Sequence, residues 1–542
     1  MVHPAGRSLE ELSEGEPCEG GLENSRIAGL LMAPRRRVWT TLVEWRVALT
    51  AFAVFAASIL VYLRTLTPGL EFMDTGEFQT VTYVLGIAHP TGYPLYTIVG
   101  KLFGTLLPVY SWAFRMNLMS ALCAAIAAAM LAVLAIRYKV SPVVAFVAAL
   151  GFAFALNTWK AADKADPYTL TVMIGAALWL LEVKWAETGE RCWLWAIAIV
   201  AGVGLGSAGV LAMELPAIIT YAVITQPRKF FAPSTMIVAG LLGIVGVVGI
   251  YSFLPIRASM NPPLNYGDTV TWKGFQFVVL GGQVGGVINY LTWPILGVAI
   301  KRLPQVFAWY EEWLTPAGLA IGVLFALVGL GTLVIREWRF ALCIALGFIV
   351  PIYPTVTIPI NDTSHYVLIS NWLVLFVAAV GAQVLIVDPI LKIDYGSFRQ
   401  SLYLIACAAF LWLPVQLAQA NWDAADMHDH HDAEIAVQKT FPLLKPNAVV
   451  ISWWGPSTAL WYGKYVGGFR PDVEIIDDSQ MSKHGWTIGS DAIAYYLGKR
   501  PVYTVPFSDE LEQYRKRFRV KLVADLQVFG LSLYEIVGPV SH

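Results

Sequence analysis

The chain has 542 residues, of which 57% are hydrophobic and only 14% are charged, and its mean hydropathy is +0.60. This balance excludes a soluble globular protein and predicts an α-helical polytopic membrane protein. The net charge of −1 argues against a nucleic-acid partner, because such proteins need a basic surface that neutralises phosphates. The five cysteines include no CxxC pair, so neither a disulfide framework nor a zinc site is expected.

Three parts of the chain differ in composition. Residues 1–40 begin as an acidic, glycine-rich stretch with no apolar run followed by a cleavage site, which predicts a disordered cytoplasmic tail rather than a signal peptide. Residues 41–420 are mainly apolar and form the predicted transmembrane domain. Residues 421–542 are more polar and form the predicted C-terminal domain.

The transmembrane domain contains apolar stretches near the roughly 20 residues that a helix needs to cross a bilayer. We predict about eleven spans on this basis. They are 44–63, 114–136, 141–158, 168–183, 193–206, 208–226, 234–255, 315–335, 340–359, 366–387 and 401–419. Segments 95–109 and 276–300 are also apolar, but Gly and Pro interrupt them, so we expect interfacial or re-entrant helices there.

Lysine and arginine in the short loops predict the orientation, because these residues gather on the cytoplasmic side. The predicted spans leave six basic groups on one side. They are Arg35-Arg36-Arg37, Arg137 with Lys139, Lys184 with Arg191, Arg228-Lys229, Arg336 with Arg339, and Lys392 with Arg399. The N-terminus is then cytoplasmic, and the loop around Asp74, the 158–167 loop, the 256–314 stretch, the 360–365 loop and everything after about residue 420 are extracytoplasmic.

The first external loop places charge beside the bilayer. It reads Thr67-Pro68-Gly69-Leu70-Glu71-Phe72-Met73-Asp74-Thr75-Gly76-Glu77-Phe78 and continues at His89-Pro90-Thr91-Gly92-Tyr93-Pro94. Ionisable groups near the hydrocarbon usually mark a pathway or an active site. Asp74 and Glu77 are therefore candidate functional residues, although carboxylates at a helix start can also serve only to satisfy free N–H groups.

The C-terminal domain alternates short β-branched runs with polar helical stretches. Strands are predicted at 448–454, 473–478 and 501–505, with helices at 456–466 and 491–499. This alternation favours a small extracytoplasmic α/β domain with a mostly parallel sheet. No glycine-rich phosphate loop follows the strands, so no nucleotide is expected.

Several blocks of the sequence resemble one family of membrane enzymes. The blocks are Leu66-Thr67-Pro68, 74–78, 86–96, 115–121, 254–257, 261–268, and Trp461-Tyr462 through 470–473. They look like the signature of bacterial membrane proteins related to the eukaryotic plexin-type protein O-mannosyltransferase, in the GT-C glycosyltransferase superfamily. Two departures are Asp166-Pro167-Tyr168, where the family tends to have Glu before a Val-Tyr pair, and Tyr266 in place of Trp.

The resemblance implies a GT-C transmembrane domain and transfer of a sugar, expected to be mannose, from a polyprenyl-phosphate carrier to an extracytoplasmic acceptor hydroxyl. A hydroxyl is a poor nucleophile, so inverting transfer needs a carboxylate base within hydrogen-bond reach. We assign this role to Asp74. Glu77 is the alternative base, or a helper that raises the basicity of Asp74 by like-charge proximity.

The lipid phosphate gains negative charge as it leaves, and a fixed cation can stabilise it. Arg257, at an external membrane boundary, is one candidate, and Arg115 and His89 are others from the first-loop side. Each has a structural alternative, since Arg115 can anchor at the interface and His89 can hold the turn before Pro90. All three therefore enter as candidate lipid-phosphate ligands.

The second external loop carries another polar cluster, formed by Lys160, Lys164 and Asp166. These residues face the same predicted compartment as the first loop. Lys164 and Asp166 are candidate substrate-binding residues, and a merely solvated loop is the alternative.

The segment after the last span has the composition of a metal-binding tract. Its members are Asp423, Asp426, His428, Asp429, His430, His431 and Asp432. Their spacing matches no defined site, so we interpret the segment as the hydrated start of a juxtamembrane helix. The first loop contains no Asp-x-Asp motif, which favours an enzyme without a metal or other cofactor, with a divalent cation as the alternative.

Two other classes of protein also place charge at the bilayer boundary. A lipid-phosphate transporter or flippase predicts broken helices in two repeated halves, and no internal repeat is visible. A non-catalytic scaffold that displays the C-terminal domain does not need acid, histidine and arginine together on one side. The sequence therefore favours an integral membrane glycosyltransferase of a bacterial plasma membrane, with membrane lipids, a polyprenyl-phosphate sugar and a protein or glycan acceptor as its partners.

Overall fold

The structure is a computed structural model. It describes residues 44–282, 301–302, 304, 316–357, 364–477, 481, 485–486 and 488–540, without the side chains of 316–319 and 354. The chain divides into two compact units, Met1–Leu49 and Thr50–His542. The described residues 44–49 of the first unit are helical, and the predicted tail, residues 1–40, lies outside the described residues. All features below belong to the second unit.

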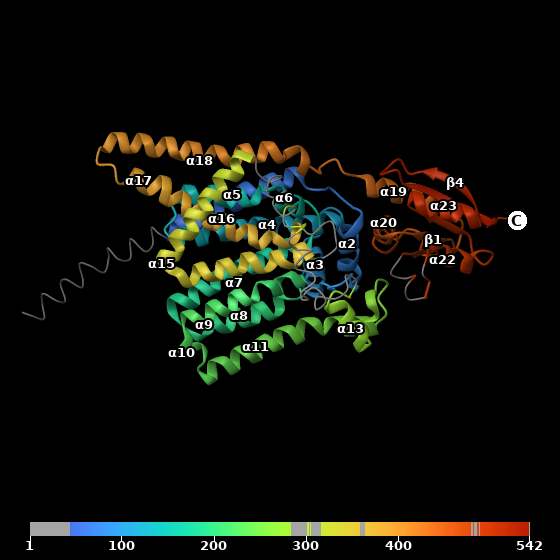
Figure 1. Cartoon of the computed structure of the whole chain (residues 1–542). Helices are drawn as coiled ribbons and strands as arrows, with labels where there is room; N and C mark the ends of the chain where they lie inside the picture. Colours follow the sequence, from blue (N-terminus) through green and yellow to red (C-terminus); the bar gives the residue numbers. More distant parts are fainter. Residues whose placement is uncertain are drawn as a thin grey trace, which may run out of the picture. The chain divides into compact units, whose positions relative to one another are not determined.

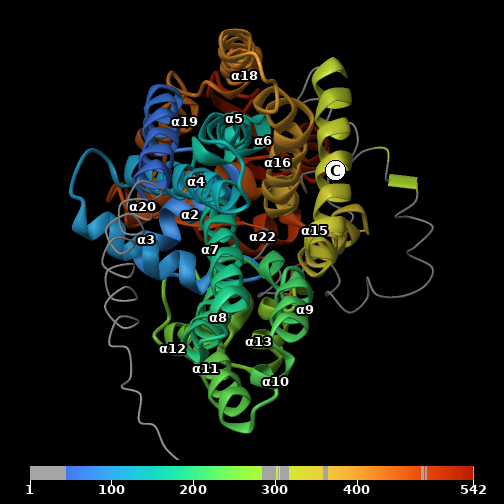
Figure 2. The ribbon, with the colours of Figure 1, turned by 90° about the vertical axis from the view of Figure 1, so that its left-hand side faces the viewer.

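Helices make up nearly all of the described part of the transmembrane domain (Figure 1). In chain order after the first span they are α2 (Met73–Val84), α3 (Pro94–Leu106), α4 (Trp112–Arg137), α5 (Pro142–Ala153), α6 (Leu156–Ala162), α7 (Pro167–Thr188), α8 (Arg191–Gly204), η1 (Gly209–Met213), α9 (Leu215–Thr225), α10 (Pro227–Phe230), α11 (Pro233–Tyr251), α12 (Phe253–Ser259), α13 (Trp272–Val279), α15 (Pro316–Thr357), α16 (Leu368–Ala382), α17 (Asp388–Leu391) and α18 (Gly396–Ala425). Figure 2, turned by 90°, shows α18 on one side of this bundle and α11 on the other, with α4 and α7 between them.

Seven helices in the described part of the chain are long and apolar enough to cross a membrane, and the bent pair α5 and α6 would add an eighth. These helices confirm an α-helical integral membrane protein. The predicted spans 193–206 and 208–226 fall on shorter apolar helices. Two further predicted spans, 315–335 and 340–359, share α15, which bends where Glu337 leaves helical geometry (φ −149°, ψ 63°; Figure 1). The number of about eleven spans stays a prediction.

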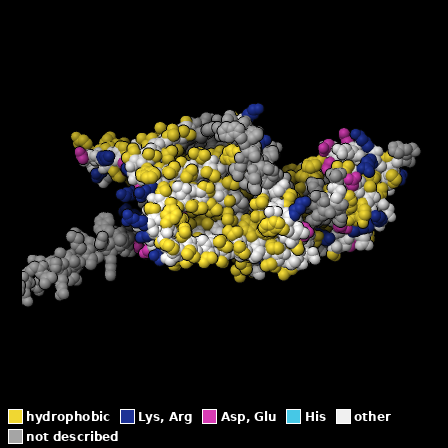
Figure 3. All heavy atoms as spheres, turned by 60° about the horizontal axis from the view of Figure 1, so that its bottom comes forward, with side chains coloured by type: hydrophobic (Ala, Val, Ile, Leu, Met, Phe, Trp, Pro, Cys, Tyr) yellow, Lys and Arg dark blue, Asp and Glu magenta, His cyan; other side chains and the backbone are white. Residues whose placement is uncertain are grey.

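Buried tryptophans connect neighbouring helices of the bundle. The indole N–H of Trp159 donates to Thr65 Oγ1 at 2.9 Å, and that of Trp372 donates to the Ala127 carbonyl oxygen at 2.8 Å. Polar atoms inside a bilayer need such internal partners because no water is available there. The flank of the bundle is covered mainly by hydrophobic side chains, as lipid contact requires (Figure 3).

Several basic loops that were predicted to share one side of the membrane do meet in space. Arg137 at the end of α4 lies 3.3 Å from Glu187 near the end of α7, and Lys229 donates to the Thr188 carbonyl oxygen at 3.4 Å. Asp166 precedes the opposite end of α7, whose 22 residues span about 33 Å at 1.5 Å per residue. The basic end and the acidic loops are thus separated by about one bilayer thickness.

The C-terminal domain is a layered α/β unit. Its helices in the described part are α19 (Asp432–Thr440), α20 (Trp454–Tyr465), α22 (Gly489–Tyr496) and α23 (Ser508–Arg517). Its strands are β1 (Val449–Ser452), β2 (Glu474–Ile476), β3 (Val502–Val505), β4 (Phe518–Asp525) and β5 (Ser532–Pro539). Over the described residues these form one sheet of order β2-β1-β3-β5-β4.

The predicted parallel strands are confirmed, because β1 pairs in parallel with both β2 and β3. The hairpin of β4 and β5, which adds two antiparallel strands beside β3, was missed. Most of β4 is exposed or only half-buried and carries charged side chains such as Arg519 and Lys521, so it lacks the apolar run that marks a buried strand.

Close packing of α15 on α16 depends on two glycines. A Cβ at Gly329 would overlap the Val377 carbonyl oxygen, and a Cβ at Gly381 would overlap the Phe325 carbonyl oxygen. Backbone atoms cannot move away as a flexible side chain could. Small residues at such crossings let membrane helices approach closely.

We therefore expect Gly381→Ala to destabilise the protein by about 1–3 kcal/mol, the usual cost of overpacking. Gly331→Ala is the matched control, because a Cβ added at Gly331 would meet no other atom within 4 Å. The measurement is the thermal unfolding midpoint in detergent. An equal midpoint for the two variants would contradict the proposed close crossing.

Candidate active site

A cavity of about 2390 Å³ lies among the start of α2, the start of α7, α11, α15 and the C-terminal domain. Its lining is mainly apolar and aromatic. The described ionisable side chains that line it, tyrosines apart, are Glu71, Asp74, His89, Lys164, Asp166 and His365. An apolar cavity with a few convergent polar groups is the arrangement expected of a binding site.

Asp74 lies in the first turn of α2 and projects into this cavity with 61% of its side chain exposed. Its Oδ1 accepts a hydrogen bond from the indole N–H of Trp454 at 2.8 Å, and its Oδ2 lies 3.9 Å from His89 Nε2. Phe72 is the N-cap residue of α2, and no side chain caps that helix. Asp74 therefore faces the cavity instead of capping its own helix.

Glu77 lies one helical turn later but is buried, with 2% of the residue exposed, and it does not line the cavity. Its Oε1 accepts from the backbone N–H of His89 at 2.8 Å, and its Oε2 pairs with the His89 ring. A buried carboxylate is stable only when paired and hydrogen-bonded. This geometry fits Glu77 as the group that holds His89 and leaves Asp74 as the accessible carboxylate.

His89 lies between the two carboxylates, with 15% of its side chain exposed. Its Nε2 is 3.4 Å from the Tyr93 hydroxyl, and its ring meets Trp454 edge to face. Burial opposes protonation, but the charges of Glu77 and Asp74 and the hydrogen bond to Glu77 raise the pKa of His89 to about 9. His89 is therefore a cation at neutral pH.

The second external loop reaches the same cavity. Asp166 caps α7 by accepting from the backbone N–H of Tyr168 at 2.7 Å, and its Oδ2 lies 3.5 Å from His365 Nδ1. Lys164 is half-buried, lines the cavity and has no hydrogen-bond or ion-pair partner in the described part of the chain. Lys160, one turn earlier, is exposed and does not line the cavity.

The two predicted arginines do not reach the cavity. Arg115 donates to three backbone carbonyl oxygens, those of Gly104, Val109 and Tyr110, at 2.8 to 3.0 Å. Arg257 donates to the carbonyl oxygens of Val84 and Leu85 at 3.1 and 2.8 Å.

Both arginines thus satisfy backbone groups, and for Arg257 these are at the end of α2, where helical carbonyls lack partners. The structure gives Arg115 and Arg257 stabilising contacts, and their contact with a lipid phosphate stays a prediction.

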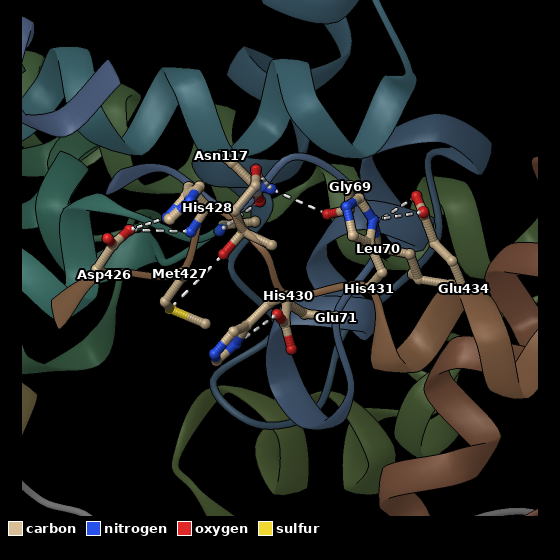
Figure 4. A network of polar contacts seen from close by, with 12 residues as sticks. Gly69, Leu70, Glu71, Asn117, Asp426, Met427, His428, His430, His431 and Glu434 are labelled. Carbon is tan, nitrogen blue, oxygen red and sulfur yellow. Dashed lines mark hydrogen bonds and ion pairs between the residues drawn. The ribbon is translucent and has the colours of Figure 1, made fainter. Parts of the chain in front are cut away.

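The Asp- and His-rich segment connects α18 to α19 and packs on the first external loop (Figure 4). His430 Nδ1 lies 3.5 Å from Glu71 Oε1, and Glu434 Oε1 accepts from the backbone N–H of Leu70 at 3.3 Å. His431 Nδ1 lies 3.2 Å from Glu434 Oε2. Among the described residues no three His, Cys, Asp or Glu side chains are grouped as metal ligands. The segment leads from α18, which ends at Ala425, to α19, which begins at Asp432, so the predicted helix start lies at its end.

Sequence reasoning missed Trp454, Tyr168 and His365 as site residues. Trp454 is 380 residues from Asp74, and it appeared in the sequence only as the end of a predicted strand. Tyr168 stacks on His365 with ring centroids 5.5 Å apart. No local sequence pattern predicts the contacts of Trp454 with Asp74 or of Tyr168 with His365, because each joins segments that are distant in the chain.

The raised pKa of His89 predicts how stability depends on pH. The unfolded chain has the ordinary value near 6.5, so the pair with Glu77 contributes fully below about pH 6.5. That contribution is lost as the pH rises through about 9. We expect wild-type protein to lose about 1–3 kcal/mol over this interval.

Thermal unfolding from pH 6 to pH 10 measures this loss. Glu77→Gln should flatten the dependence, because the amide cannot stabilise the imidazolium. Glu512→Gln, at an exposed position of α23, should keep the wild-type dependence. A slope that is unchanged in Glu77→Gln would show that the pair is not responsible.

Known proteins resemble this chain in sequence and in fold. Residues 74–230 match the family model of the Protein O-mannosyl-transferase TMEM260 N-terminal domain. Protein O-mannosyl-transferase TMEM260 of Mus musculus is 24% identical over 454 residues, which are 79% of this chain and 62% of that protein. The Dictyostelium discoideum protein of the same name is 26% identical over 132 residues, 24% of this chain and 16% of that protein. The chain thus spans less than two thirds of the curated relatives it matches.

Among solved structures, ArnT from Cupriavidus metallidurans in the apo state has a TM-score of 0.58 at 12% identity, covering 92% of this chain and 98% of ArnT. ArnT from the same organism bound to undecaprenyl phosphate has a TM-score of 0.53 at 12% identity, covering 89% and 97%. At this identity the likeness establishes the fold. Together the matches confirm the resemblance inferred from the sequence: the chain is similar to the protein O-mannosyl-transferases named TMEM260 and shares the fold of ArnT.

Proposed function

We propose that this protein transfers a sugar, expected to be mannose, from a polyprenyl-phosphate carrier to an acceptor hydroxyl on the extracytoplasmic side, with protein Ser or Thr as the favoured acceptor. The names of the curated relatives support a protein O-mannosyltransferase, and the ArnT structure with undecaprenyl phosphate supports a polyprenyl carrier. One observation carries the proposal. Asp74 is an exposed carboxylate in a largely apolar cavity, with partners on both of its oxygens.

Asp74 fits the role of the catalytic base. A carboxylate oxygen can accept two hydrogen bonds, so the bond from Trp454 leaves Asp74 with free acceptor sites that face the cavity. The acceptor hydroxyl would give its proton to Asp74 as its oxygen forms the new bond to the anomeric carbon. The bond from that carbon to the phosphate oxygen breaks, and the phosphate keeps the electron pair.

The leaving phosphate requires positive charge near the reacting carbon. Of the described residues that line the cavity, Lys164 and protonated His89 supply it. His89 is held in place by Glu77, whereas the Lys164 ammonium makes no hydrogen bond to the described residues and interacts with Glu71 only through charge. We assign the first contact with the lipid phosphate to Lys164, and stabilisation of the charge near Asp74 to His89.

The apolar wall of the cavity fits the lipid part of the donor. It includes Val247, Val248 and Tyr251 of α11 and Ile349 and Val350 of α15. Exposed apolar side chains also cover the outer face of α11, including Ile244 and Val245. A polyprenyl chain could therefore reach the cavity from the bilayer without crossing water.

The test of the base is Asp74→Asn, which keeps the shape of the side chain and removes its basicity. We expect a loss of about 10²- to 10⁴-fold in kcat, the usual contribution of a general base. The assay follows transfer from a purified polyprenyl-phosphate mannose to a Ser/Thr peptide. Asp423→Asn, near the end of α18 and away from the cavity, is the control and should keep wild-type activity.

Full activity of Asp74→Asn would remove Asp74 from the mechanism. Movement of the lipid across a vesicle membrane by the wild type, without any sugar transfer, would instead support the transporter alternative. A wild type that does neither would support the scaffold alternative.

The two loop lysines test the phosphate assignment. Lys164→Ala should raise the KM for the lipid donor about tenfold, because a hydrogen bond to a charged group contributes about 1.5–3 kcal/mol. Lys160→Ala makes the same change one turn earlier, at an exposed position outside the cavity, and should leave that KM unchanged. Equal effects of the two substitutions would show that only the general charge of the loop matters.

A further inference from the structure

The C-terminal domain contributes the Trp454 side chain to the cavity that holds Asp74. We propose that Trp454 is a positioning residue for Asp74, so that the active site is assembled from both the transmembrane and the C-terminal domain. This inference rests on the proposed role of Asp74 as the base. No local sequence motif joins the two residues, which are 380 positions apart.

The topology of the C-terminal sheet brings Trp454 to the cavity. Strands β1 and β3 run in parallel, so their carboxyl ends meet at one edge of the sheet. Trp453 and Trp454 follow β1, and Pro506 and Phe507 follow β3, and all four line the same cavity as Asp74. Ligand sites of α/β sheets are usually found at this edge.

Two glycines let the first turn of α20 approach the first turns of α2. A Cβ at Gly76 would overlap the Glu71 carbonyl oxygen and lie 3.0 Å from Thr458 Oγ1. A Cβ at Gly455 would overlap the Trp453 ring and lie 2.9 Å from Met73 Sδ. The contact between the domains at this point is therefore close and allows little freedom.

The Trp454 indole is fixed by three aromatic neighbours. Its ring meets those of His89, Tyr266 and Trp461 edge to face, with centroids 5.8, 6.2 and 5.7 Å apart. The ring therefore keeps its N–H directed at Asp74 Oδ1, 2.8 Å away. Aromatic pairs of this geometry restrict ring rotation.

This hydrogen bond has a catalytic consequence because Asp74 is otherwise weakly held. Its side chain is 61% exposed, and its other described partner, His89, is 3.9 Å away. An indole N–H can only donate, so Trp454 cannot take the proton from the acceptor. It can only fix the carboxylate and leave its remaining acceptor sites for the hydroxyl. A base held in a reactive geometry acts faster than one that must find it.

The experiment compares two tryptophan substitutions. Trp454→Phe keeps an aromatic ring and removes the N–H, and we expect kcat to fall about tenfold or more while the KM for the lipid donor stays within about twofold. Trp195→Phe is the matched control. Trp195 belongs to α8, does not line the cavity, and its indole N–H has no hydrogen-bond partner in the described part of the chain.

Two further variants separate positioning from structure. Trp454→His restores an N–H donor and should recover part of the lost kcat. In an Asp74→Asn background, Trp454→Phe should cause no further loss, because its effect passes through the carboxylate. Equal thermal unfolding midpoints of all variants establish that the folded state is intact.

Three outcomes would overturn the inference or its basis, and they can be told apart. Wild-type kcat in Trp454→Phe, with Asp74→Asn inactive, would overturn the role of Trp454 alone. An equal loss in Trp195→Phe would show that the effect does not depend on the hydrogen bond to Asp74. Full activity of Asp74→Asn would overturn the proposed base itself.

Discussion

The pairing of Glu77 with His89 is the constraint on which the site depends. Glu77 is a buried residue of α2, and a carboxylate there must be neutralised by a partner. His89 supplies both its backbone N–H and its ring to that carboxylate, which fixes the loop between α2 and α3. The same ring then lies between Glu77 and Asp74 and next to Trp454. The buried pair therefore places the His89 ring beside the exposed carboxylate of Asp74 and the ring of Trp454.

Two carboxylates one helical turn apart take different roles because their surroundings differ. Glu77 does not line the cavity, and both of its carboxylate oxygens contact His89. Asp74 lines the cavity and keeps acceptor sites that face it. From their spacing in the sequence, both Asp74 and Glu77 were candidates for the catalytic base. Their surroundings distinguish them, as the surroundings of paired acids do in known enzymes.

Features that depend on local hydropathy and residue type could be predicted from the sequence. Contacts between residues far apart in the chain could not. The helical membrane domain, the strands 449–452 and 502–505, and the importance of the Asp74 to His89 loop follow from hydropathy, β-branched runs and a motif. The contacts of Arg257 do not, because its partners Val84 and Leu85 are more than 170 residues away. The sequence around an arginine does not show whether its side chain binds a lipid phosphate or donates to the free carbonyl oxygens at the end of a helix.

The β4–β5 hairpin and Trp454 were also missed, because their residue types do not indicate their structural roles. Strand β4 lies at an edge of the sheet and is largely exposed, so its sequence lacks the apolar run by which a buried strand is recognised. Trp454 is apolar and would be expected in a core, yet its indole N–H is aimed at a carboxylate of another domain.

Under the proposed function one substrate comes from the bilayer and the other from the aqueous side, so the site has to lie where the two phases meet. The membrane helices can supply the apolar wall for the lipid. A carboxylate placed among them would lack water and polar partners, which is energetically costly. Asp74 avoids this cost because it lies at the first turn of α2, where the C-terminal domain covers it with Trp454 while leaving it open to the cavity. The C-terminal domain thus holds the proposed base by a hydrogen bond without burying it.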